Sequence, residues 1–271
     1  MKHIYEDIKK SKRIVVKVGT STLTYSTGKT NLKIVDKLAR VLSDLQNQGK
    51  EVVLVSSGAI GMAVGKLGLA QKPKETVKKQ AVAAVGQCEL MYLYDKLFSE
   101  YNNTVAQILV TGDDILVPRR KRNMQNTINE LLAMGIIPIV NENDTVSADE
   151  IEIGDNDNLS AMVADMIDAD LLILFSDIDG LYDSDPHFNK NAKMLDVVLD
   201  IDAIESMAGN SSTKQGTGGM ITKLEAARRA VNAGIHMIIA NGQNVSALYD
   251  ILEGKQVGTL FVSRNFKNIE E

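Results

Sequence analysis

The segment Asn141–Ser160, NENDTVSADEIEIGDNDNLS, places a dense set of Asn, Asp and Glu side chains directly after the apolar run Gly135–Val140. A buried strand that opens into short carboxylates and amides is how α/β proteins present a ligand site at the C-terminal end of a strand. Asx turns alone would explain one such cluster, but two occur within these twenty residues. We therefore expect the segment to hold a small, charged molecule that forms hydrogen bonds.

Three other segments combine a strand end or a helix start with glycine and groups that suit anions. Lys17 lies two residues before Gly19 in VKVGTS, where its ammonium can reach phosphates. Val55–Gly61, VSSGAIG, leads from a strand into a helix whose N-terminus favours an anion, although Ser57 could instead serve only as the N-cap. Gly216–Lys223, GTGGMITK, opens a helix with backbone that can cradle phosphates or form a flexible loop.

The elements that position these segments alternate between short apolar runs and longer stretches with helical spacing. The expected strands are Arg13–Val18, Glu51–Val55, Val105–Val110, Ile136–Val140, Leu171–Phe175 and Ile235–Ala240. Glycine stands where a helix ends before a strand at positions 49, 135 and 234. Near-continuous apolar strands that alternate with helices predict an α/β protein with a parallel sheet covered on both faces. Turn residues predict hairpins or excursions at Asp144–Gly154 and Asp179–Ile201.

Composition narrows the class of protein. The 271 residues carry a net charge of −5, which argues against nucleic acid as a partner because phosphate-backbone binding requires a basic face. The single cysteine, Cys88, excludes an internal disulfide and a zinc site of several thiolates. We expect Cys88 to be buried in a helix over Gln80–Leu97. No signal peptide or membrane-length apolar run is present in the sequence, so we expect a cytoplasmic protein without a membrane partner.

Several familiar motifs fail at single positions. A Walker A loop ending at Gly28-Lys29-Thr30 would need glycine where Leu23 stands, and a dinucleotide fingerprint from Gly216 would need glycine at Ile221. An EF-hand from Asp155 breaks at Leu159. The sequence contains no HExxH, CxxC or GxSxG motif, so metalloprotease, thiol-redox and serine-hydrolase chemistry have no support.

Taken in order, the segments resemble the amino acid kinase family, and most closely its glutamate kinases. The resemblance runs from about Arg13 to Phe261 and rests on VKVGTS, SSGAIG, AAVGQ, NENDTV, GDNDNLSA, SDIDGLYDSDP, GTGGMITKLEAA and VGTLF. It implies a three-layer α/β/α sandwich around a mainly parallel sheet. It also implies transfer of the γ-phosphoryl of Mg²⁺-bound ATP to the side-chain carboxylate of L-glutamate, the first step of proline biosynthesis.

The resemblance also assigns roles to residues of this chain. Lys17 and Lys223 would stabilise the transferring phosphoryl group, and Asp157 would hold both lysines. The residues expected to bind glutamate are Ser57, Asp144 and Asn156, with Asn141 and Asp155 contributing. The residues expected to bind ATP are Lys17, Ser176, Asp177, Thr217, Gly218, Gly219, Met220, Ile221, Thr222 and Lys223. No protein metal site is expected, because ATP phosphates and water would hold Mg²⁺.

The remaining expectations concern organisation and regulation. We expect one domain over residues 1–271, with a glutamate-side lobe to about residue 168 and a nucleotide-side lobe over about 169–263. The C-terminal PUA domain of many glutamate kinases is not expected, since the sequence stops soon after VGTLF. A homo-oligomer, feedback inhibition by L-proline near Asp144 and Asn156, and a mobile flap at Thr145–Gly154 are further expectations.

Three other functions remain as alternatives. The first is another carboxylate or carbamate kinase of the same fold, because fold does not determine the substrate. The second is a catalytically silent amino-acid or nucleotide sensor, which would not need the two lysines Lys17 and Lys223. The third is a nicotinamide dehydrogenase, which lacks its fingerprint here.

Overall fold

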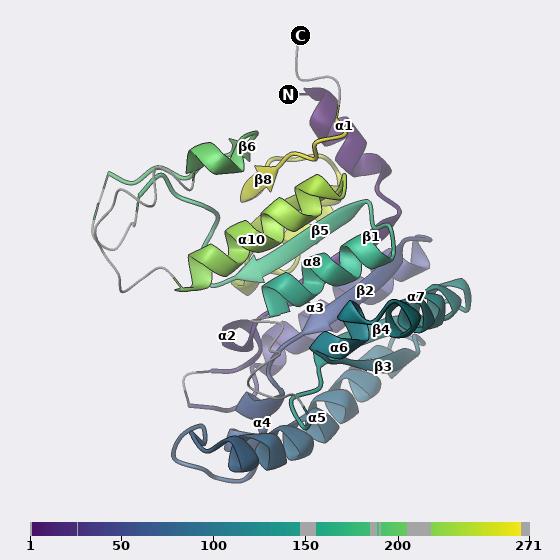
Figure 1. The fold of residues 1–271 in the computed structure, drawn as a ribbon, viewed down its shortest axis with the longest axis vertical. Helices are drawn as coiled ribbons and strands as arrows, with labels where there is room; N and C mark the ends of the chain where they lie inside the picture. Colours follow the sequence, from purple (N-terminus) through teal and green to yellow (C-terminus); the bar gives the residue numbers. More distant parts are fainter. Residues whose placement is uncertain are drawn as a thin grey trace.

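A computed structural model describes residues 2–25, 27–146, 156–184, 189, 191–204 and 218–266. Its described strands form one eight-stranded sheet in the order β3-β4-β2-β1-β5-β7-β8-β6 (Figure 1). The strands are β1 Arg13–Val18, β2 Glu51–Ser56, β3 Val105–Val110, β4 Ile137–Glu142, β5 Leu171–Ser176, β6 Val197–Val198, β7 His236–Asn241 and β8 Thr259–Phe261. All their pairings are parallel except the antiparallel pair β7–β8. The six strands expected from the sequence are confirmed within one or two residues at each end.

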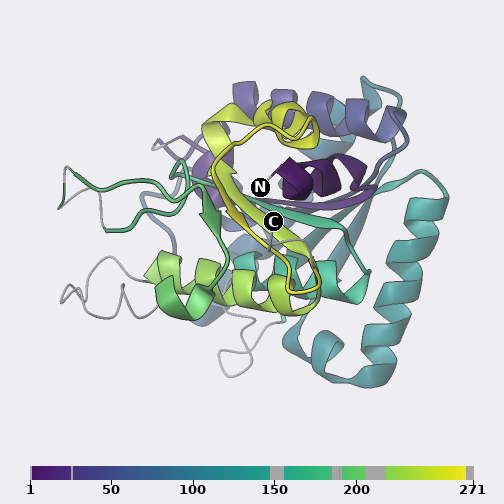
Figure 2. The same ribbon diagram turned by 90° about the horizontal axis from the view of Figure 1, so that it is seen from above.

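Helices cover both faces of this sheet. They are α1 Lys2–Lys10, α2 Thr20–Leu23, α3 Leu32–Asn47, α4 Ala59–Lys66, α5 Thr76–Ser99, α6 Gly112–Leu116, α7 Pro118–Ala133, α8 Asn156–Met166, α10 Gly218–Asn232 and α11 Ala247–Leu252, with a 3₁₀ turn η1 at Gly242–Asn244. Figure 2 shows the blue-purple α3 and yellow α11 on one side of the sheet and the light-green α10 on the other. None of the described helices is long and apolar enough to span a membrane.

Successive side chains along each strand point to alternate faces of the sheet, and each face carries its own hydrophobic core. In β1, Ile14, Val16 and Val18 belong to the core that includes side chains of α1, α3, α5 and α11. Val15 faces the opposite way, into the core formed with α7, α8 and α10. Successive side chains of a strand point to opposite faces, so a strand that is apolar throughout must be covered on both sides. The expected three-layer α/β/α sandwich is thereby confirmed.

The helix-ending glycines adopt the backbone conformation that was expected of them. Gly49, Gly135 and Gly234 follow α3, α7 and α10 with φ of +85°, +71° and +84°. Glycine takes this left-handed conformation without the steric cost that a Cβ atom would add. Each therefore ends a helix and turns the chain into the next strand.

The order of the strands explains where a site can form. The chain passes from β1 to β2 on one side and later returns to place β5 on the other side of β1. Ligands of open α/β sheets bind outside the carboxyl ends of the strands at such a reversal. The lobe boundary expected near residue 168 falls between α8 and β5, and the sheet continues across it.

Two local expectations have different outcomes. The Asp179–Ile201 excursion contains antiparallel pairing between Tyr182 and Met194, as expected of a hairpin, before β6 joins β8 in parallel. The Asp144–Gly154 excursion lies mostly outside the described residues, so its conformation stays a prediction.

The prediction that Cys88 is buried is wrong, because the side chain is exposed. Helix α5 points Gly86, Gln87, Leu90 and Tyr94 inward. Cys88 falls on another face of the same helix. The apolar composition of the run suggested burial, but α5 is covered on only one side.

Candidate active site

The carboxyl ends of the parallel strands gather side chains that are distant in the sequence. Lys17 stands near the end of β1, Asn141 near the end of β4 and Ser176 at the end of β5. Ser57 follows β2 directly, and its backbone N–H donates to the carbonyl oxygen of Val18 at 3.0 Å. Parallel strands end at the same edge of a sheet, and this edge therefore carries the site.

A buried carboxylate between two ammonium groups forms the centre of the site. Asp157, in the first turn of α8, has a side chain only 1% exposed. Lys17 Nζ lies 2.5 Å from Asp157 Oδ1, and Lys223 Nζ lies 3.0 Å from Oδ2. Burial alone would raise the pKa of Asp157, but the charges and hydrogen bonds of the two lysines outweigh burial and lower it. The carboxylate is therefore ionised, and the three groups carry one net positive charge.

Glycine leaves room beside both ammonium groups. A Cβ atom added at Gly19 would lie 3.5 Å from Lys17 Nζ, and one added at Gly219 would lie 4.0 Å from Lys223 Nζ. Lys223 Nζ also donates to the carbonyl oxygen of Gly219 at 3.2 Å. The open space and the excess positive charge together suit an anionic ligand that contacts both lysines.

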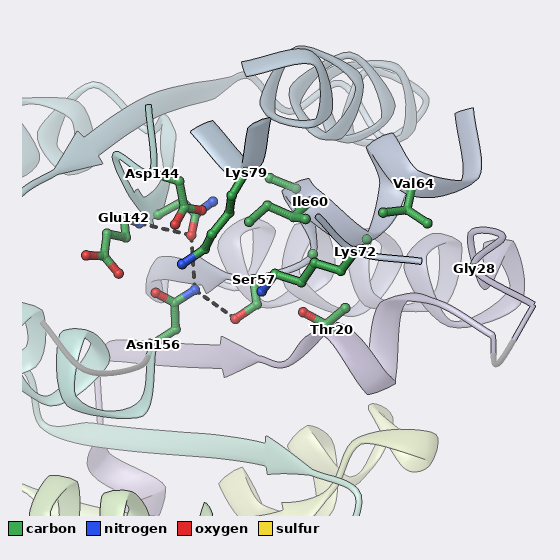
Figure 3. A pocket seen from close by; sticks show the side chains of 14 residues that line it. Thr20, Gly28, Ser57, Ile60, Val64, Lys72, Lys79, Glu142, Asp144 and Asn156 are labelled. Atoms are coloured by element: carbon green, nitrogen blue, oxygen red, sulfur yellow. Dashed lines mark hydrogen bonds between the residues drawn. The ribbon is translucent and has the colours of Figure 1, made fainter. Parts of the chain in front are cut away.

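A chain of amide groups leads from helix α5 to Ser57. Asn141 Nδ2 donates to Gln87 Oε1 at 2.9 Å, and Asn156 Nδ2 donates to Asn141 Oδ1 at 3.0 Å. The second hydrogen of Asn156 Nδ2 is donated to Ser57 Oγ at 2.7 Å, as the dashed line in Figure 3 shows. Ser57 thus accepts at its oxygen and keeps its hydroxyl proton for a ligand. Gly58, with φ of +102°, is the N-cap of α4, so Ser57 is not acting only as a cap.

A cavity of about 430 Å³ opens beside this chain, and its wall carries both signs of charge (Figure 3). Asp144, Lys72 and Lys79 line it together with Ser57 and Asn156. Glu142 also lines it, but in Figure 3 its carboxylate points away from the other labelled side chains. This volume falls within the usual range for small-molecule sites. Walls with both charges favour a ligand that has both carboxylate and ammonium groups.

The other described residues expected to bind ATP lie at the end of β5 and at the start of α10. Ser176 is 7% exposed at the end of β5 and donates from Oγ to Asp177 Oδ1 at 3.0 Å. Thr222 Oγ1 donates to the carbonyl oxygen of Gly219 in the first turn of α10 at 3.2 Å. Ile221 is 51% exposed. Of the remaining expected residues, Gly218 and Met220 lie in the same turn, whereas Asp155 and Thr217 lie outside the described residues.

Sequence reasoning missed Gln87 and Lys79. Gln87 is 8% exposed and holds Asn141, and its own Nε2 has no hydrogen-bond partner among the described residues. A polar amide between apolar helix positions was the available signal, because a buried amide requires partners. Lys79 carried no such signal, since a lysine in a helix ordinarily faces solvent.

Within the described part of the chain, no group of three or more His, Cys, Asp or Glu side chains is arranged to hold a metal. Asp157 does not fit as a metal ligand, because both its oxygens face lysine ammonium groups. A divalent ion that accompanies a nucleotide keeps most of its ligands as phosphates and water.

Sequence comparison identifies the family of proteins to which this fold and site belong. The chain belongs to the amino acid kinase family, whose sequence pattern matches residues 12–241. It is 58% identical over 262 residues to the glutamate 5-kinase of Clostridium perfringens, covering 95% of this chain and 97% of the relative. It is 53% identical to the glutamate 5-kinase of Listeria innocua, covering 96% of each chain. The resemblance to glutamate kinases inferred from the motifs is confirmed.

Other relatives differ in length or in sequence. The glutamate 5-kinase of Thermoanaerobacter sp. is 52% identical, and the match covers 92% of this chain but 68% of that relative. Among solved structures, carbamate kinase from Giardia lamblia bound to AMP-PNP has a TM-score of 0.66 at 15% identity, covering 94% of this chain and 99% of that one. UMP kinase from Bacillus anthracis has a TM-score of 0.64 at 20% identity, covering 94% and 97%. These two structures show a shared fold only.

Proposed function

We propose that this protein transfers the γ-phosphoryl group of ATP to the side-chain carboxylate of L-glutamate, which opens proline biosynthesis. The observation that carries the proposal is the adjacency of Asn156 and Asp157. Asn156 belongs to the amide chain that reaches Ser57 and lines the cavity, and Asp157 organises Lys17 and Lys223. An amino-acid pocket and a phosphoryl-binding centre therefore meet at the start of α8. The glutamate 5-kinase relatives support the same substrate.

In the proposed reaction, a γ-carboxylate oxygen attacks the terminal phosphorus of ATP. The new bond joins this oxygen to phosphorus, the bond from phosphorus to the bridging oxygen of ADP breaks, and the products are L-glutamyl 5-phosphate and ADP. Lys17 and Lys223 stabilise the charge on the equatorial oxygens of the transferring group. A carboxylate is already ionised at neutral pH, so no general base is needed and positioning carries the catalysis.

The cavity residues would orient glutamate for this attack. The Ser57 hydroxyl donates to the γ-carboxylate, and Asp144 pairs with the α-ammonium group. Asn156 uses both Nδ2 hydrogens within the protein, so its contribution is to hold Ser57 and to offer Oδ1. Asn141 acts through Asn156, and Asp155 is proposed to contribute from the same motif.

ATP would bind across the carboxyl ends of β5 and the start of α10. Ser176, Asp177 and the Thr217–Lys223 segment form this side, and ATP brings Mg²⁺ with its phosphates. The two lobes, to about residue 168 and over about 169–263, would thus serve glutamate and nucleotide respectively. L-Proline would compete in the Asp144 region, because its ammonium and carboxylate resemble the α-carbon end of glutamate. We also propose that the protein acts in the cytoplasm as a homo-oligomer.

The substrate is tested by measuring the rate of ATP turnover with glutamate, N-acetylglutamate, aspartate or carbamate as the phosphoryl acceptor. Trapping the product with hydroxylamine as a hydroxamate identifies an acyl phosphate. We expect glutamate to be preferred and glutamyl hydroxamate to form. If carbamate were the preferred acceptor, the proposal would be wrong, and the protein would be a carbamate kinase of the same fold. The Lys223→Ala variant should keep its fold and lose turnover, and Asp144→Ala should raise the KM for glutamate far more than that for ATP.

A further inference from the structure

The proposed function leaves one charged group of the substrate without a cationic partner. L-Glutamate carries a γ-carboxylate, an α-carboxylate and an α-ammonium group. The γ-carboxylate must face Lys17 and Lys223 to receive the phosphoryl group, and the ammonium group pairs with Asp144. The inference below rests on this proposed function and concerns the α-carboxylate.

Lys79 enters the cavity from the wall opposite Asn156. It completes the first turn of α5, is half-buried, and lines the cavity with Asp144 and Asn156. Figure 3 shows its side chain running from α5 toward the region between these two residues. A long cationic side chain that is partly withdrawn from water gains most from an anion that meets it there.

The neighbouring lysines do not share this position. Lys78, one residue earlier on α5, is 71% exposed and pairs with Glu75 on the surface at 2.7 Å. Lys72 also lines the cavity, but it is exposed and lies in the connection before α5. Lys79 therefore combines a place in the cavity with partial burial, which neither of these lysines does.

Helix stability does not explain a lysine at this position. The N-terminal end of a helix carries the positive end of the dipole, which favours acidic side chains and disfavours cations. The first turn of α5 nevertheless contains no acidic residue and instead includes Lys78 and Lys79. The stability of the helix therefore does not account for the position of Lys79.

We propose that Lys79 binds the α-carboxylate of the amino-acid substrate. Lys79 and Asp144 lie at the same end of the cavity, so one α-carbon can present its carboxylate to the lysine and its ammonium group to the aspartate (Figure 3). The pair selects α-amino acids over simple dicarboxylates and ω-amino acids, each of which satisfies only one of the two charges.

The test compares L-glutamate with L-isoglutamine, in which the α-carboxylate is a neutral carboxamide of nearly the same size and the γ-carboxylate is unchanged. The KM for each compound is measured in the wild type, in Lys79→Met and in Lys78→Met. Where isoglutamine turns over too slowly for a KM, its inhibition constant as a competitor of glutamate is measured instead. Lys79→Met should raise the KM for glutamate about 10- to 100-fold, the usual range for a lost hydrogen bond to a charged group. The constants for isoglutamine and ATP should stay within about 3-fold.

Lys78→Met serves as the matched control and should leave all three constants unchanged. Methionine favours helix about as well as lysine, and a Lys79→Gln variant repeats the measurement if Lys79→Met is unstable. An equal rise for glutamate and isoglutamine, or no rise for glutamate, would overturn the role of Lys79. Absence of glutamate turnover in the wild type would instead overturn the proposed function, so the two failures are distinct.

Discussion

Replacing Asp157 by asparagine tests the central arrangement most directly. The substitution keeps the shape of the side chain but removes the charge between Lys17 and Lys223, whose side chains are only 10% and 13% exposed. At separations of about 3 Å, each ion pair has a Coulomb energy of about 5 kcal/mol for an effective dielectric constant near 20. Desolvation of the charged groups offsets much of this, so the loss of unfolding free energy should be about 3–5 kcal/mol.

The loss should appear in urea denaturation followed by circular dichroism, and as a fall of about 10 °C in melting temperature. Asp165→Asn, on the same helix α8, is the matched control and should change stability by less than about 0.5 kcal/mol. Magnesium–ADP should restore more stability in Asp157→Asn than in the wild type, because its phosphates can take over the two unpaired ammonium groups. The kcat should fall at least about 100-fold, since the lysines are no longer held in place.

The pH dependence gives an independent check. Because the folded-state pKa of Asp157 lies below its ordinary value, the stability that it contributes is present above about pH 4 and is lost as the pH falls further. The stability difference between the wild type and Asp157→Asn should therefore shrink in acid. A variant with wild-type stability and a kcat within about 3-fold of the wild type would refute the reasoning about this ion-pair centre.

Three further predictions follow from buried contacts. Gln87→Leu should lower the free energy of unfolding by about 1–3 kcal/mol, because it leaves the Asn141 amide without its acceptor. It should also raise the KM for glutamate but not for ATP, and unchanged kinetics would show that the amide chain does not position the substrate. Gly86→Ala should lower the urea midpoint by the equivalent of about 3 kcal/mol or more, since its Cβ would lie 1.7 Å from the Ala59 carbonyl oxygen; a normal midpoint would contradict this close approach. Burial lowers the pKa of His236 despite the opposing effect of a neighbouring carboxylate, so near its ordinary pKa the unfolded chain binds a proton that the native chain does not. The free energy of unfolding should therefore fall as the pH drops below about 6.5. If a His236→Asn variant lost stability equally steeply between about pH 7.5 and 5.5, another group would be responsible for the effect.

Much of the site was predictable because its parts are local. The lysine near the end of a strand, the glycine-rich helix start and the clustered Asn and Asp side chains are short-range patterns. The structure places Lys17 and Lys223 in ion pairs with Asp157. The strand positions followed from runs of apolar residues, which must be buried on both faces. The pattern of α5 did not show which face would remain uncovered, and Cys88 was misplaced for that reason.

Sequence alone determined the kinds of chemical group available: ammonium groups, carboxylates, and amides beside a strand end. Only the tertiary structure decided which of these groups meet. Asn156 reaches Ser57 across 99 residues and Asn141 reaches Gln87 across 54, contacts that depend on the order of strands in the sheet and on how α4 and α5 cross. Lys79 enters the cavity for the same reason. A local pattern records the preferences of neighbouring residues, whereas a binding site depends on contacts between segments that only the packed core brings together.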